Sequence, residues 1–441
     1  MLSSHLLHTL QMHETTDFGR LGRHLPVRWV EQAIGATGKA SVRRRRLPAE
    51  QVVWLVIALA LYRHQSISEV VDTLDLALPD KDDRFVCKSA IAQARERVGQ
   101  APLQWLFRES ARCWIGQQAK DQGCKGLALL AMDGTTFRTQ DSPENRAHFG
   151  AQRYVGGRVA SYPQVRAVSL TAIPTHLVSD IAFGAYGTNE MLYAKTLLGR
   201  IPDQSLTVFD KGFLAAEILL GLSQSGQERY FLIPAKSSTR WEVIKGSVDD
   251  FTVRMRVSDA ARKHNPALPR TWMARAVRTL TSSGKSRILL TSLTDRRRFR
   301  AADIVACYNR RWEIETSYRE LKQSMLGCAL TLRSRLPEGV YQEIWGALIA
   351  YNIVRMEMAQ AARQAKVQPT DLSFVRAFHI VQHEMMWAAI TSPGKLPAHL
   401  RRLRLQLQFA ILEKRRGRSR PRVVKALPNR YCVRYLKRDL N

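Results

Sequence analysis

Gly126-Leu-Ala-Leu-Leu-Ala-Met-Asp133 is a short apolar stretch that starts at a glycine and ends at an aspartate. A run of this length and composition is typical of a buried β-strand. The stretch Ser205-Leu-Thr-Val-Phe-Asp210 repeats the pattern, again with an aspartate at its carboxyl end. In open α/β sheets, reactive groups lie at the carboxyl ends of the strands. One aspartate in such a place is more often a turn former or a helix N-cap, but a pair that ends two strands of one sheet favours a metal site, so we expect Asp133 and Asp210 at one edge of a sheet.

The sequence around these two strands alternates between strand-like and helix-like segments. Further strands are expected at 164–173 and 176–183, helices at 88–118, 189–198, 215–222, 301–335 and 342–362, and short β-like pieces between 229 and 290. This order of elements predicts an α/β protein built on a mixed sheet.

The two ends of the chain differ from this central part. Near the N-terminus, Pro48 followed by Glu50 predicts the start of an apolar helix that runs to Tyr62, and Ser66 with Glu69 matches a capping box. The C-terminal end is rich in Lys and Arg. We expect three parts: a helical N-terminal domain at 1–85, a central α/β domain at 86–365 with a β-rich segment at 225–292, and a basic helical C-terminal region at 366–441.

The charge of the chain points to a polyanionic partner. It carries 68 Lys and Arg against 38 Asp and Glu, a formal net charge of +30. A surplus of this size on a globular composition favours nucleic acid as the partner, with an anionic membrane surface as the second possibility. Four consecutive arginines could grip DNA phosphates or form a solvated loop: Arg43, Arg44, Arg45 and Arg46.

Membrane insertion and disulfide or zinc chemistry find little support in the sequence. The longest apolar run, Val52–Tyr62, is far shorter than the ~20 residues that a membrane span requires. The N-terminus lacks a secretion-signal pattern, and the six cysteines are widely spaced without a CxxC pair. These features predict a cytoplasmic protein with reduced thiols.

A third carboxylate comes from the segment Tyr308-Asn-Arg-Arg-Trp-Glu-Ile-Glu-Thr-Ser-Tyr-Arg-Glu-Leu-Lys322. On a regular helix, the side chains that would share one narrow face are those of Tyr308, Arg311, Glu315 and Lys322. Helical spacing places Glu313 and Glu320 on the opposite face. The alternative interpretation is an exposed helix face held by salt bridges.

Three carboxylates at one point repel each other unless a divalent cation neutralises them. Hard oxygen ligands favour Mg²⁺ or Mn²⁺. Two such ions ~4 Å apart can activate a water or a 3′-hydroxyl and stabilise the leaving oxygen of a phosphodiester. Asp133, Asp210 and Glu315 are therefore the candidate ligands of one or two ions.

At these residues the sequence resembles the IS4 family of bacterial insertion-sequence transposases of the DDE type. Its helix matches the family signature Tyr-x2-Arg-x3-Glu-x6-Lys at every position. Three further segments resemble the first-aspartate region, the second-aspartate region and the helical N-terminal domain of that family: Met132–Phe137 with Asp141–Asn145, Val208–Phe213, and Pro48–Leu78.

The resemblance implies an RNase H-like mixed-sheet catalytic core with a β-rich insertion before the glutamate helix. It implies that Asp133, Asp210 and Glu315 are catalytic metal ligands, and that the phosphates of the transposon end are contacted by Tyr308, Arg311 and Lys322. Some relatives stack a flipped base on a Trp of the insertion strand before that helix. Here the strand 287–292 has none, and Trp241 and Trp272 are the remaining candidates.

We therefore expect a cut-and-paste transposase, associated with the nucleoid, that binds the terminal inverted repeats and target DNA and dimerises on DNA. Two alternatives keep the same fold: a non-catalytic DNA-binding relative, and a nuclease that acts on DNA junctions. The intact set of three acids argues against the first, and a joined donor–target product would exclude the second.

Overall fold

The computed structural model describes residues 25–40, 47–74, 76, 86–118, 123–154, 157–281, 284–326, 331–388, 403–412 and 433–434. Most of the Lys/Arg-rich C-terminal end lies outside the described residues. The same is true of the whole basic run predicted to contact DNA, which comprises Arg43, Arg44, Arg45 and Arg46. Within the described part, no helix combines the length and the apolar character needed to cross a bilayer.

A group of helices precedes the sheet. Its members are α3 (Val27–Ala36), α4 (Ala49–Leu61), α5 (Ile67–Thr73), α6 (Lys88–Val98) and α7 (Ala101–Gln118). The predicted capping box is confirmed, because the Ser66 Oγ accepts from the Glu69 amide while the Ser66 amide donates to Glu69 Oε2 at 2.6 Å. The helix predicted over 88–118 is two helices, since Gly99 between them has a φ of +67°.

The nine-stranded sheet begins with an RNase H-like half. Its strands are β1 (Ala128–Arg138), β3 (Gln164–Ala172), β4 (Val178–Ala185), β5 (Ser205–Phe209) and β6 (Arg229–Pro234), in the order β4-β3-β1-β5-β6. Strand β3 runs antiparallel to β1 and β4, whereas β1, β5 and β6 are parallel. This confirms the predicted fold class. Strand β4 starts two residues later than predicted, because His176 turns the chain with a φ of +60°.

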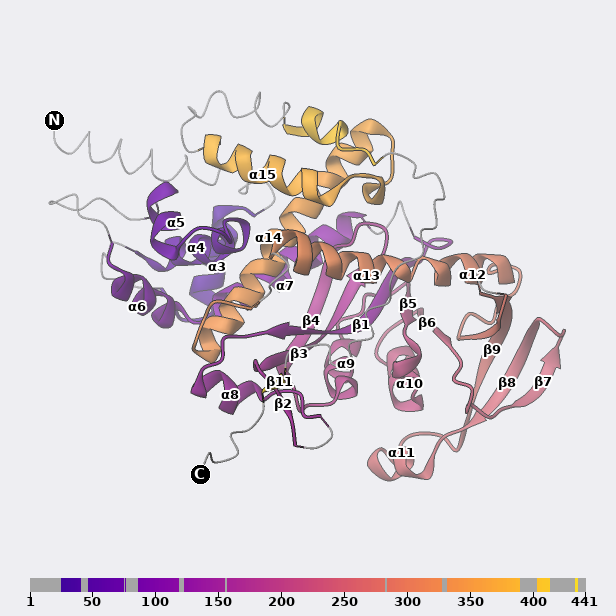
Figure 1. The fold of residues 1–441 in the computed structure, drawn as a ribbon. Coiled ribbons are helices and arrows are strands. Elements are labelled where there is room, and N and C mark those ends of the chain that lie inside the picture. Colours follow the sequence, from indigo (N-terminus) through magenta and orange to yellow (C-terminus); the bar gives the residue numbers. More distant parts are fainter. Residues whose placement is uncertain are drawn as a thin grey trace.

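The predicted β-rich segment continues this same sheet. After β6 the order runs on as β10-β9-β8-β7, all antiparallel. The elements are β7 (Glu242–Gly246), β8 (Asp250–Arg256), the short helix α11 (Asp259–His264), β9 (Thr271–Leu280) and β10 (Ser286–Thr291). Figure 1 shows these strands extending the sheet to one side, away from the N-terminal helices.

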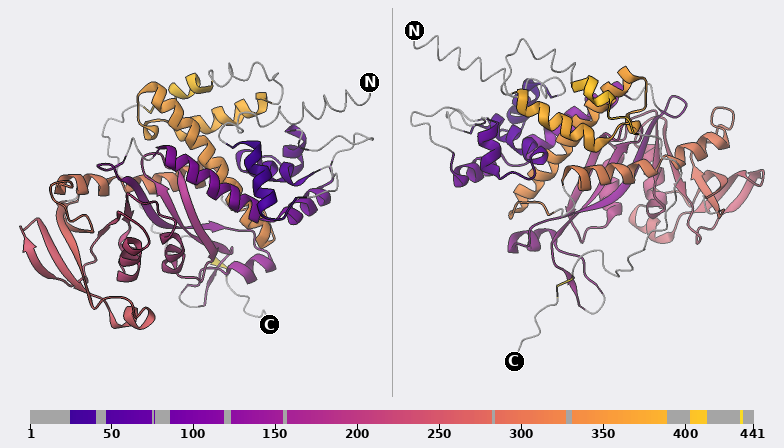
Figure 2. Two further views of the ribbon diagram at one scale, coloured as in Figure 1. Left: turned by 180° about the vertical axis from the view of Figure 1, so that it is seen from behind. Right: turned by 45° about the horizontal axis from the view of Figure 1, so that its top comes forward.

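Helices cover both faces of the RNase H-like half (Figure 2). On one face, α9 (Glu190–Leu198) and α10 (Ala216–Gln224) pack on β3, β4 and β6. On the other face, α12 (Ala301–Asn309) and α13 (Trp312–Arg319) pack over Leu129 and Ala131 of β1 and over Leu206 and Val208 of β5. Alternate residues of each strand therefore face different helices, as the pleat of a strand requires.

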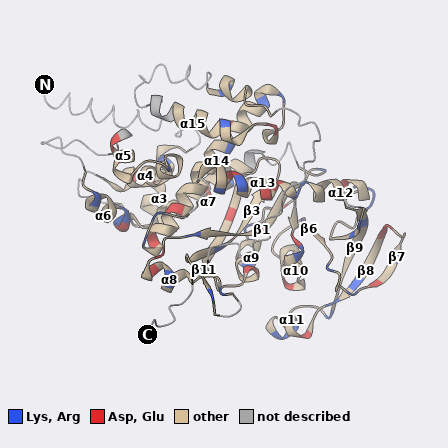
Figure 3. Ribbon diagram, viewed as in Figure 1, with Lys and Arg blue, Asp and Glu red and all other residues tan. Residues whose placement is uncertain are grey.

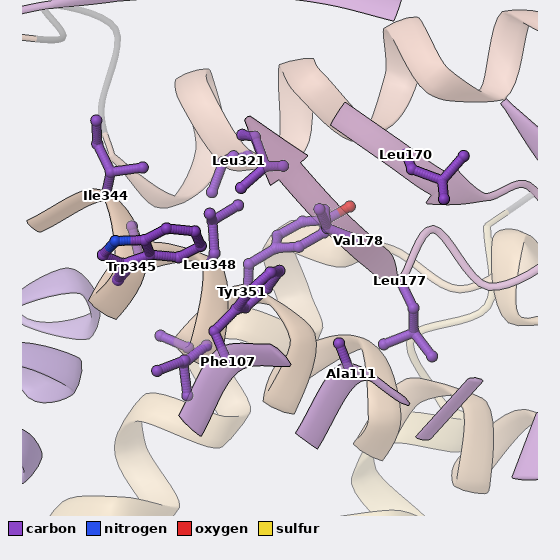
Figure 4. Packing of buried hydrophobic residues seen from close by; sticks show 14 of the residues in the cluster. Phe107, Ala111, Leu170, Leu177, Val178, Leu321, Ile344, Trp345, Leu348 and Tyr351 are labelled. Atoms are coloured by element: carbon purple, nitrogen blue, oxygen red, sulfur yellow. The ribbon is translucent and has the colours of Figure 1, made fainter. Parts of the chain in front are cut away.

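The long helix α14 (Pro337–Ala365) connects the helical region to the sheet. It packs against α4, whose residues 52–61 are all buried, and against α7. Figure 4 shows Trp345 and Tyr351 of α14 among Phe107 of α7, Val178 of β4 and Leu321. The N-terminal helices thus share one hydrophobic core with the sheet.

The remaining elements are short or peripheral. They are α8 (Pro143–Phe149), the 3₁₀ turns Lys211–Phe213 and Pro369–Asp371, the π-helical segment Glu320–Met325, α15 (Phe374–Ala388), and the small sheet of β2 (Val159–Ala160) with β11 (Val433–Arg434).

Candidate active site

The sheet brings the two aspartates together. Strands β1 and β5 are paired in parallel up to Met132 and Phe209, so Asp133 and Asp210 are the next residues on neighbouring strands. Each also continues the series of alternate residues that faces α12 and α13. The pair therefore lies at the carboxyl end of the parallel ladder, on the face covered by these two helices.

The two aspartates were both predicted to end their strands, but each has a different local role in the structure. Strand β1 does not stop at Asp133 as predicted; it continues to Arg138, because the long antiparallel partner β3 still pairs with it. Asp133 Oδ1 accepts from the Gly134 amide at 2.7 Å. Asp210 is an N-cap, since its Oδ2 accepts from the Gly212 amide at 3.2 Å and starts the 3₁₀ turn. The N-cap alternative thus holds for Asp210 alongside its place at the site.

The third acid, Glu315, lies on α13, which is fixed directly to β1. The hydroxyl of Tyr318 donates to the carbonyl oxygen of Asp133 at 2.7 Å and lies 2.8 Å from Ser169 Oγ on β3. Tyr318 is partly buried, and desolvation of its hydroxyl raises its pKa well above the usual value, so the group stays a neutral donor. Because Glu315 is less than one helical turn from Tyr318, this contact fixes the height of Glu315 above the two aspartates.

The helix that carries Glu315 is interrupted. The regular helix predicted over 301–335 is wrong in this respect: α12 ends at Asn309, α13 starts at Trp312, and residues 320–325 form a wider π-helical segment. At the interruption, amides bond to carbonyls three residues back, as in Arg311 to Tyr308 at 2.9 Å and Ile314 to Arg311 at 3.1 Å.

The four residues of the helix signature have different surroundings. Arg311 Nη2 lies 3.1 Å from Glu315 Oε1. Tyr308 is buried, with the guanidinium of Arg287 5.2 Å from its ring centre. Lys322 lies in the π-helical segment with its Nζ 5.7 Å from the ring centre of Phe137.

The charges of the site act on one another. Burial raises the pKa of Asp133 to about 6; the Gly134 amide and Arg311 act in the opposite direction, whereas the charges of Asp210 and Glu315 raise the value further. Burial alone would lower the pKa of Arg311, but Tyr308 and the three carboxylates raise it overall. All three acids and Arg311 therefore lie within one electrostatic neighbourhood, and Arg311 is the cation among them.

The donor set has the chemistry that a divalent metal prefers, because all three groups offer hard carboxylate oxygens. As the side chains are arranged, no group of three or more His, Cys, Asp or Glu in the described ranges is close enough to hold a metal ion. Desolvation is the main cause of the raised pKa of Asp133, and the charges of Asp210 and Glu315 add to it; a bound cation would relieve this excess negative charge.

The opposite side of the same helix holds a second, separate group of charges. His176 lies between Glu313 Oε2 at 2.8 Å and Glu320 Oε2 at 3.1 Å. Glu320 also accepts from the Tyr351 hydroxyl at 2.8 Å and lies 3.5 Å from Arg355 Nη1. Glu313 and Glu320 are thus bound away from the three acids, as helical spacing predicted.

Two aromatic residues near the site were not singled out from the sequence. Tyr318 is partly buried beside Ile314, Ser317 and Leu321, whose helical spacing marks the side of the helix that faces the sheet and could have identified it. Trp312 is 65% exposed beside Arg311, whose guanidinium lies 5.8 Å from its ring centre. Trp272 is buried against Phe231 and Trp241 packs on the core, so both serve packing in this structure.

Comparisons with known proteins agree with this architecture. Residues 15–108 match the family described as insertion element 4 transposase N-terminal, and residues 125–353 match the transposase DDE domain. The transposase InsG for insertion sequence element IS4 of Escherichia coli (strain K12) is 38% identical over 93% of this chain and 92% of its own length. The putative transposase InsZ of the same strain is 36% identical over 50% of this chain and 73% of its own.

Among solved structures, a piggyBac transposase synaptic complex with hairpin DNA aligns with 89% of this chain and 83% of its own, at 16% identity and a TM-score of 0.38. The two family matches cover the helical N-terminal region and the sheet that carries Asp133, Asp210 and the glutamate helix. On the family matches and the identity to InsG, the chain belongs to the IS4 family of insertion-sequence transposases and is a DDE transposase.

Proposed function

We propose that Asp133, Asp210 and Glu315 are the catalytic carboxylates of this transposase. The observation that carries the proposal is the pairing of β1 with β5, which ends at Met132 and Phe209 and so sets the two aspartates side by side. The hydrogen bond from Tyr318 to the Asp133 carbonyl supports it, because it ties the helix of Glu315 to the same point. The enzyme would cut at the transposon ends and join the freed 3′ ends to target DNA.

The three carboxylates would hold Mg²⁺ or Mn²⁺, as one or two ions. A DDE transposase depends on divalent metal, which activates the attacking oxygen and stabilises the leaving one. Asp133 must lose its proton to act as a ligand, and its raised pKa of about 6 keeps that step within the neutral pH range. Glu315 must leave its contact with Arg311 to turn toward the aspartates.

Arg311 then becomes available to a phosphate of the DNA. The Arg311 side chain is 17% exposed, and its guanidinium forms a salt bridge with Glu315. A guanidinium forms paired hydrogen bonds with phosphate as readily as with carboxylate, so the exchange needs only a small movement. Tyr308 and Lys322 are proposed to contact neighbouring phosphates of the transposon end.

The basic run near the N-terminus keeps its proposed role as a DNA contact. It lies outside the described residues, so the proposal rests on its sequence, in which four guanidinium groups follow one another: Arg43, Arg44, Arg45 and Arg46. Such a run offers several donors to the phosphate backbone without reading bases. It also precedes α4, within the part of the chain that matches the N-terminal family.

The partner is double-stranded DNA, bound at the terminal inverted repeats and at the target. The net charge of +30 supports a large contact with the phosphate backbone. We further propose that two copies assemble on DNA, that the enzyme works in the cytoplasm on the nucleoid, and that the chain divides at about 85 and 365 into end-binding, catalytic and basic C-terminal parts.

The decisive experiment replaces Glu315 by Gln. Cleavage of a duplex spanning the end of the element, taken from the DNA that flanks this coding sequence, should fall by about 10³-fold with Mg²⁺. Binding of the same duplex without metal should stay close to that of the unmodified protein.

Glu313→Gln is the matched control, because Glu313 lies on the same helix and carries the same charge but pairs with His176. This variant should cut at the normal rate. Undiminished cleavage by Glu315→Gln, or equal losses in both variants, would contradict the assignment of Glu315. A joined donor–plasmid product made by the unmodified protein distinguishes a transposase from a nuclease.

A further inference from the structure

The connection between the insertion and the glutamate helix is unusually rich in arginine. It reads Thr294-Asp-Arg-Arg-Arg-Phe-Arg300 and joins β10 directly to α12. Figure 3 shows Lys and Arg at this turn, at the end of α12 that points away from α13. None of its four arginines belongs to the family signature discussed above.

This connection is held in one shape by its own contacts. The Asp295 carboxylate accepts from the amides of Arg297 at 2.8 Å and Arg298 at 3.1 Å, which closes a tight turn. Phe299 is buried, and its carbonyl accepts from Nη1 of the equally buried Arg275 at 2.7 Å. Arg275 in turn binds both carboxylate oxygens of Asp250, at 2.8 and 2.7 Å. The turn is therefore fixed to the sheet beneath it.

Two of the four arginines have partners that explain them. Arg296 reaches Asp250 at 3.1 Å and Thr252 at 3.3 Å. Arg298 reaches Glu228 at 3.3 Å and stacks over the ring of Phe299. Arg297 and Arg300, by contrast, are exposed and form no salt bridge with any residue in the described ranges. Arg297 and Arg300 thus lie exposed before and after the buried Phe299, and their contacts within the protein do not explain why both positions carry a positive charge.

Their distance from the site can be estimated along the helix. Arg300 precedes α12, and Arg310 and Arg311 keep helical dihedral angles between α12 and α13. Figure 1 shows the two helices end to end. At 1.5 Å per residue, Arg300 lies about 16 Å from Arg311. Duplex DNA rises 3.4 Å per base pair, so this span corresponds to about five base pairs.

We propose that Arg297 and Arg300 form a phosphate clamp for duplex DNA about five base pairs from the bond that is cut. The proposal rests on the function assigned above, because it takes Arg311 and Glu315 as the position of the reacting phosphate. Exposed guanidinium groups on this turn suit phosphate oxygens, because each presents a planar set of donors and the backbone that carries them is already ordered. The bound phosphates belong to the DNA on one side of the cut, either the transposon end or the flanking DNA.

The test measures how DNA binding depends on salt in the double variant Arg297→Gln/Arg300→Gln. The probe is the duplex that spans the element end, extended beyond about five base pairs on both sides of the cut. Each lost phosphate contact reduces the slope of log K against log salt by about 0.9, so the slope should fall by about 2. The Arg297→Lys/Arg300→Lys variant keeps the charges and should keep the slope.

The control variant, Lys263→Gln/Arg270→Gln, removes two exposed positive charges at and after α11, away from α12 in Figure 1. It should leave the slope unchanged. Two shortened probes locate the clamp. One is truncated close to the cut on the transposon side and the other on the flanking side. The probe that lacks the clamped DNA should be bound equally by the double variant and by the unmodified protein.

An unchanged slope in Arg297→Gln/Arg300→Gln on the long probe would overturn the clamp, as would an equal loss in the Lys263/Arg270 control. Either result leaves the role of Glu315 intact, since that role is judged by cleavage. Conversely, a reduced slope with full cleavage by Glu315→Gln would keep the clamp as a DNA contact and refute only its distance from the reacting bond.

Discussion

Two groups of acids lie on opposite sides of the same short helix, and they are built in opposite ways. Glu320 is enclosed by Arg355, His176 and the Tyr351 hydroxyl, so each of its oxygens has a partner. Glu315 on the other side is 43% exposed and has Arg311 as its salt-bridge partner. Asp133, beside it, is partly buried near two further negative charges. One group is neutralised by the fold, and the other carries an excess of negative charge.

The difference teaches how to separate structure from function among identical residue types. The ionised Glu320 stabilises the fold, because its partners lower its pKa below the ordinary value in spite of its burial. The Asp133 group lowers the stability of the fold, because desolvation and the nearby like charges raise the pKa of this partly buried carboxylate. Such unfavourable arrangements persist at sites that bind a charged ligand. Each prediction below tests whether the two groups behave as opposites.

The largest effect on stability is expected for Glu320→Gln. Burial alone would raise the pKa of Glu320, but Arg355, His176 and Tyr351 lower it to about 2 from an ordinary 4.5. The ionised group therefore stabilises the fold by about 3 kcal/mol at neutral pH. Because the folded pKa is the lower one, this contribution is present above pH 4.5 and is lost as the pH falls toward 2.

Urea unfolding at pH 7 and at low pH measures this effect. Glu320→Gln should unfold at a clearly lower urea concentration at pH 7, and the gap to the unmodified protein should narrow as the pH falls below about 4.5. Glu315→Gln is the natural control and should unfold with the unmodified protein at pH 7. Equal stability of all three proteins would show that the two groups of acids do not differ in the way described.

Asp133→Asn should change the free energy of unfolding in the opposite direction to Glu320→Gln and by a slightly smaller amount. The pKa of Asp133 is about 6 in the folded protein against an ordinary 3.8. The fold thus favours the protonated form, and the stability associated with it is lost as the pH rises through 6. Removing the charge should stabilise the metal-free protein by about 3 kcal/mol at pH 8, and most of this difference should be gone at pH 4.

The readout is the same urea titration at pH 8 and pH 4, joined with a cleavage assay. At pH 8, Asp133→Asn should unfold at a higher urea concentration than the unmodified protein, and it should no longer cleave DNA. A variant that is less stable at pH 8 would show that Asp133 is a structural residue like Glu320 and would remove one member of the proposed catalytic set.

Much of this contrast could be predicted from the sequence, because its basis is local. Apolar runs that end in Asp133 and Asp210 predict the paired strands, and the spacing of 3.6 residues per turn separates Glu315 from Glu313 and Glu320. The parallel pairing of β1 with β5 then follows from the α/β pattern. All of these features can be predicted from the spacing of residues within short segments.

The rest depends on contacts between distant parts of the chain. No Gly or Pro marks the interruption at Arg310–Arg311, which keeps ordinary helical dihedral angles and differs only in its hydrogen bonds. His176 reaches Glu313 and Glu320 only because the turn before β4 places it under the helix. The continuation of β1 past Asp133 is decided by the length of β3. Periodicity within one segment carries none of this information.

The smallest effect is expected for Tyr318→Phe, which probes the contact that links the two sides of the helix. The variant removes the hydrogen bond to the Asp133 carbonyl and keeps the partly buried ring. We expect a loss of about 1 kcal/mol in unfolding free energy. Cleavage should fall by about tenfold at saturating DNA with unchanged DNA affinity, because Glu315 is held less firmly over the aspartates.

Ser169→Ala is the matched control for Tyr318→Phe. It removes the other partner of the Tyr318 hydroxyl, which lies 2.8 Å away, and keeps the hydrogen bond to Asp133. It should therefore reduce stability without the same reduction in cleavage. If Tyr318→Phe and Ser169→Ala lower stability alike and neither slows cleavage, Tyr318 is a packing residue, and the alignment of the three acids depends on the sheet and the helix alone.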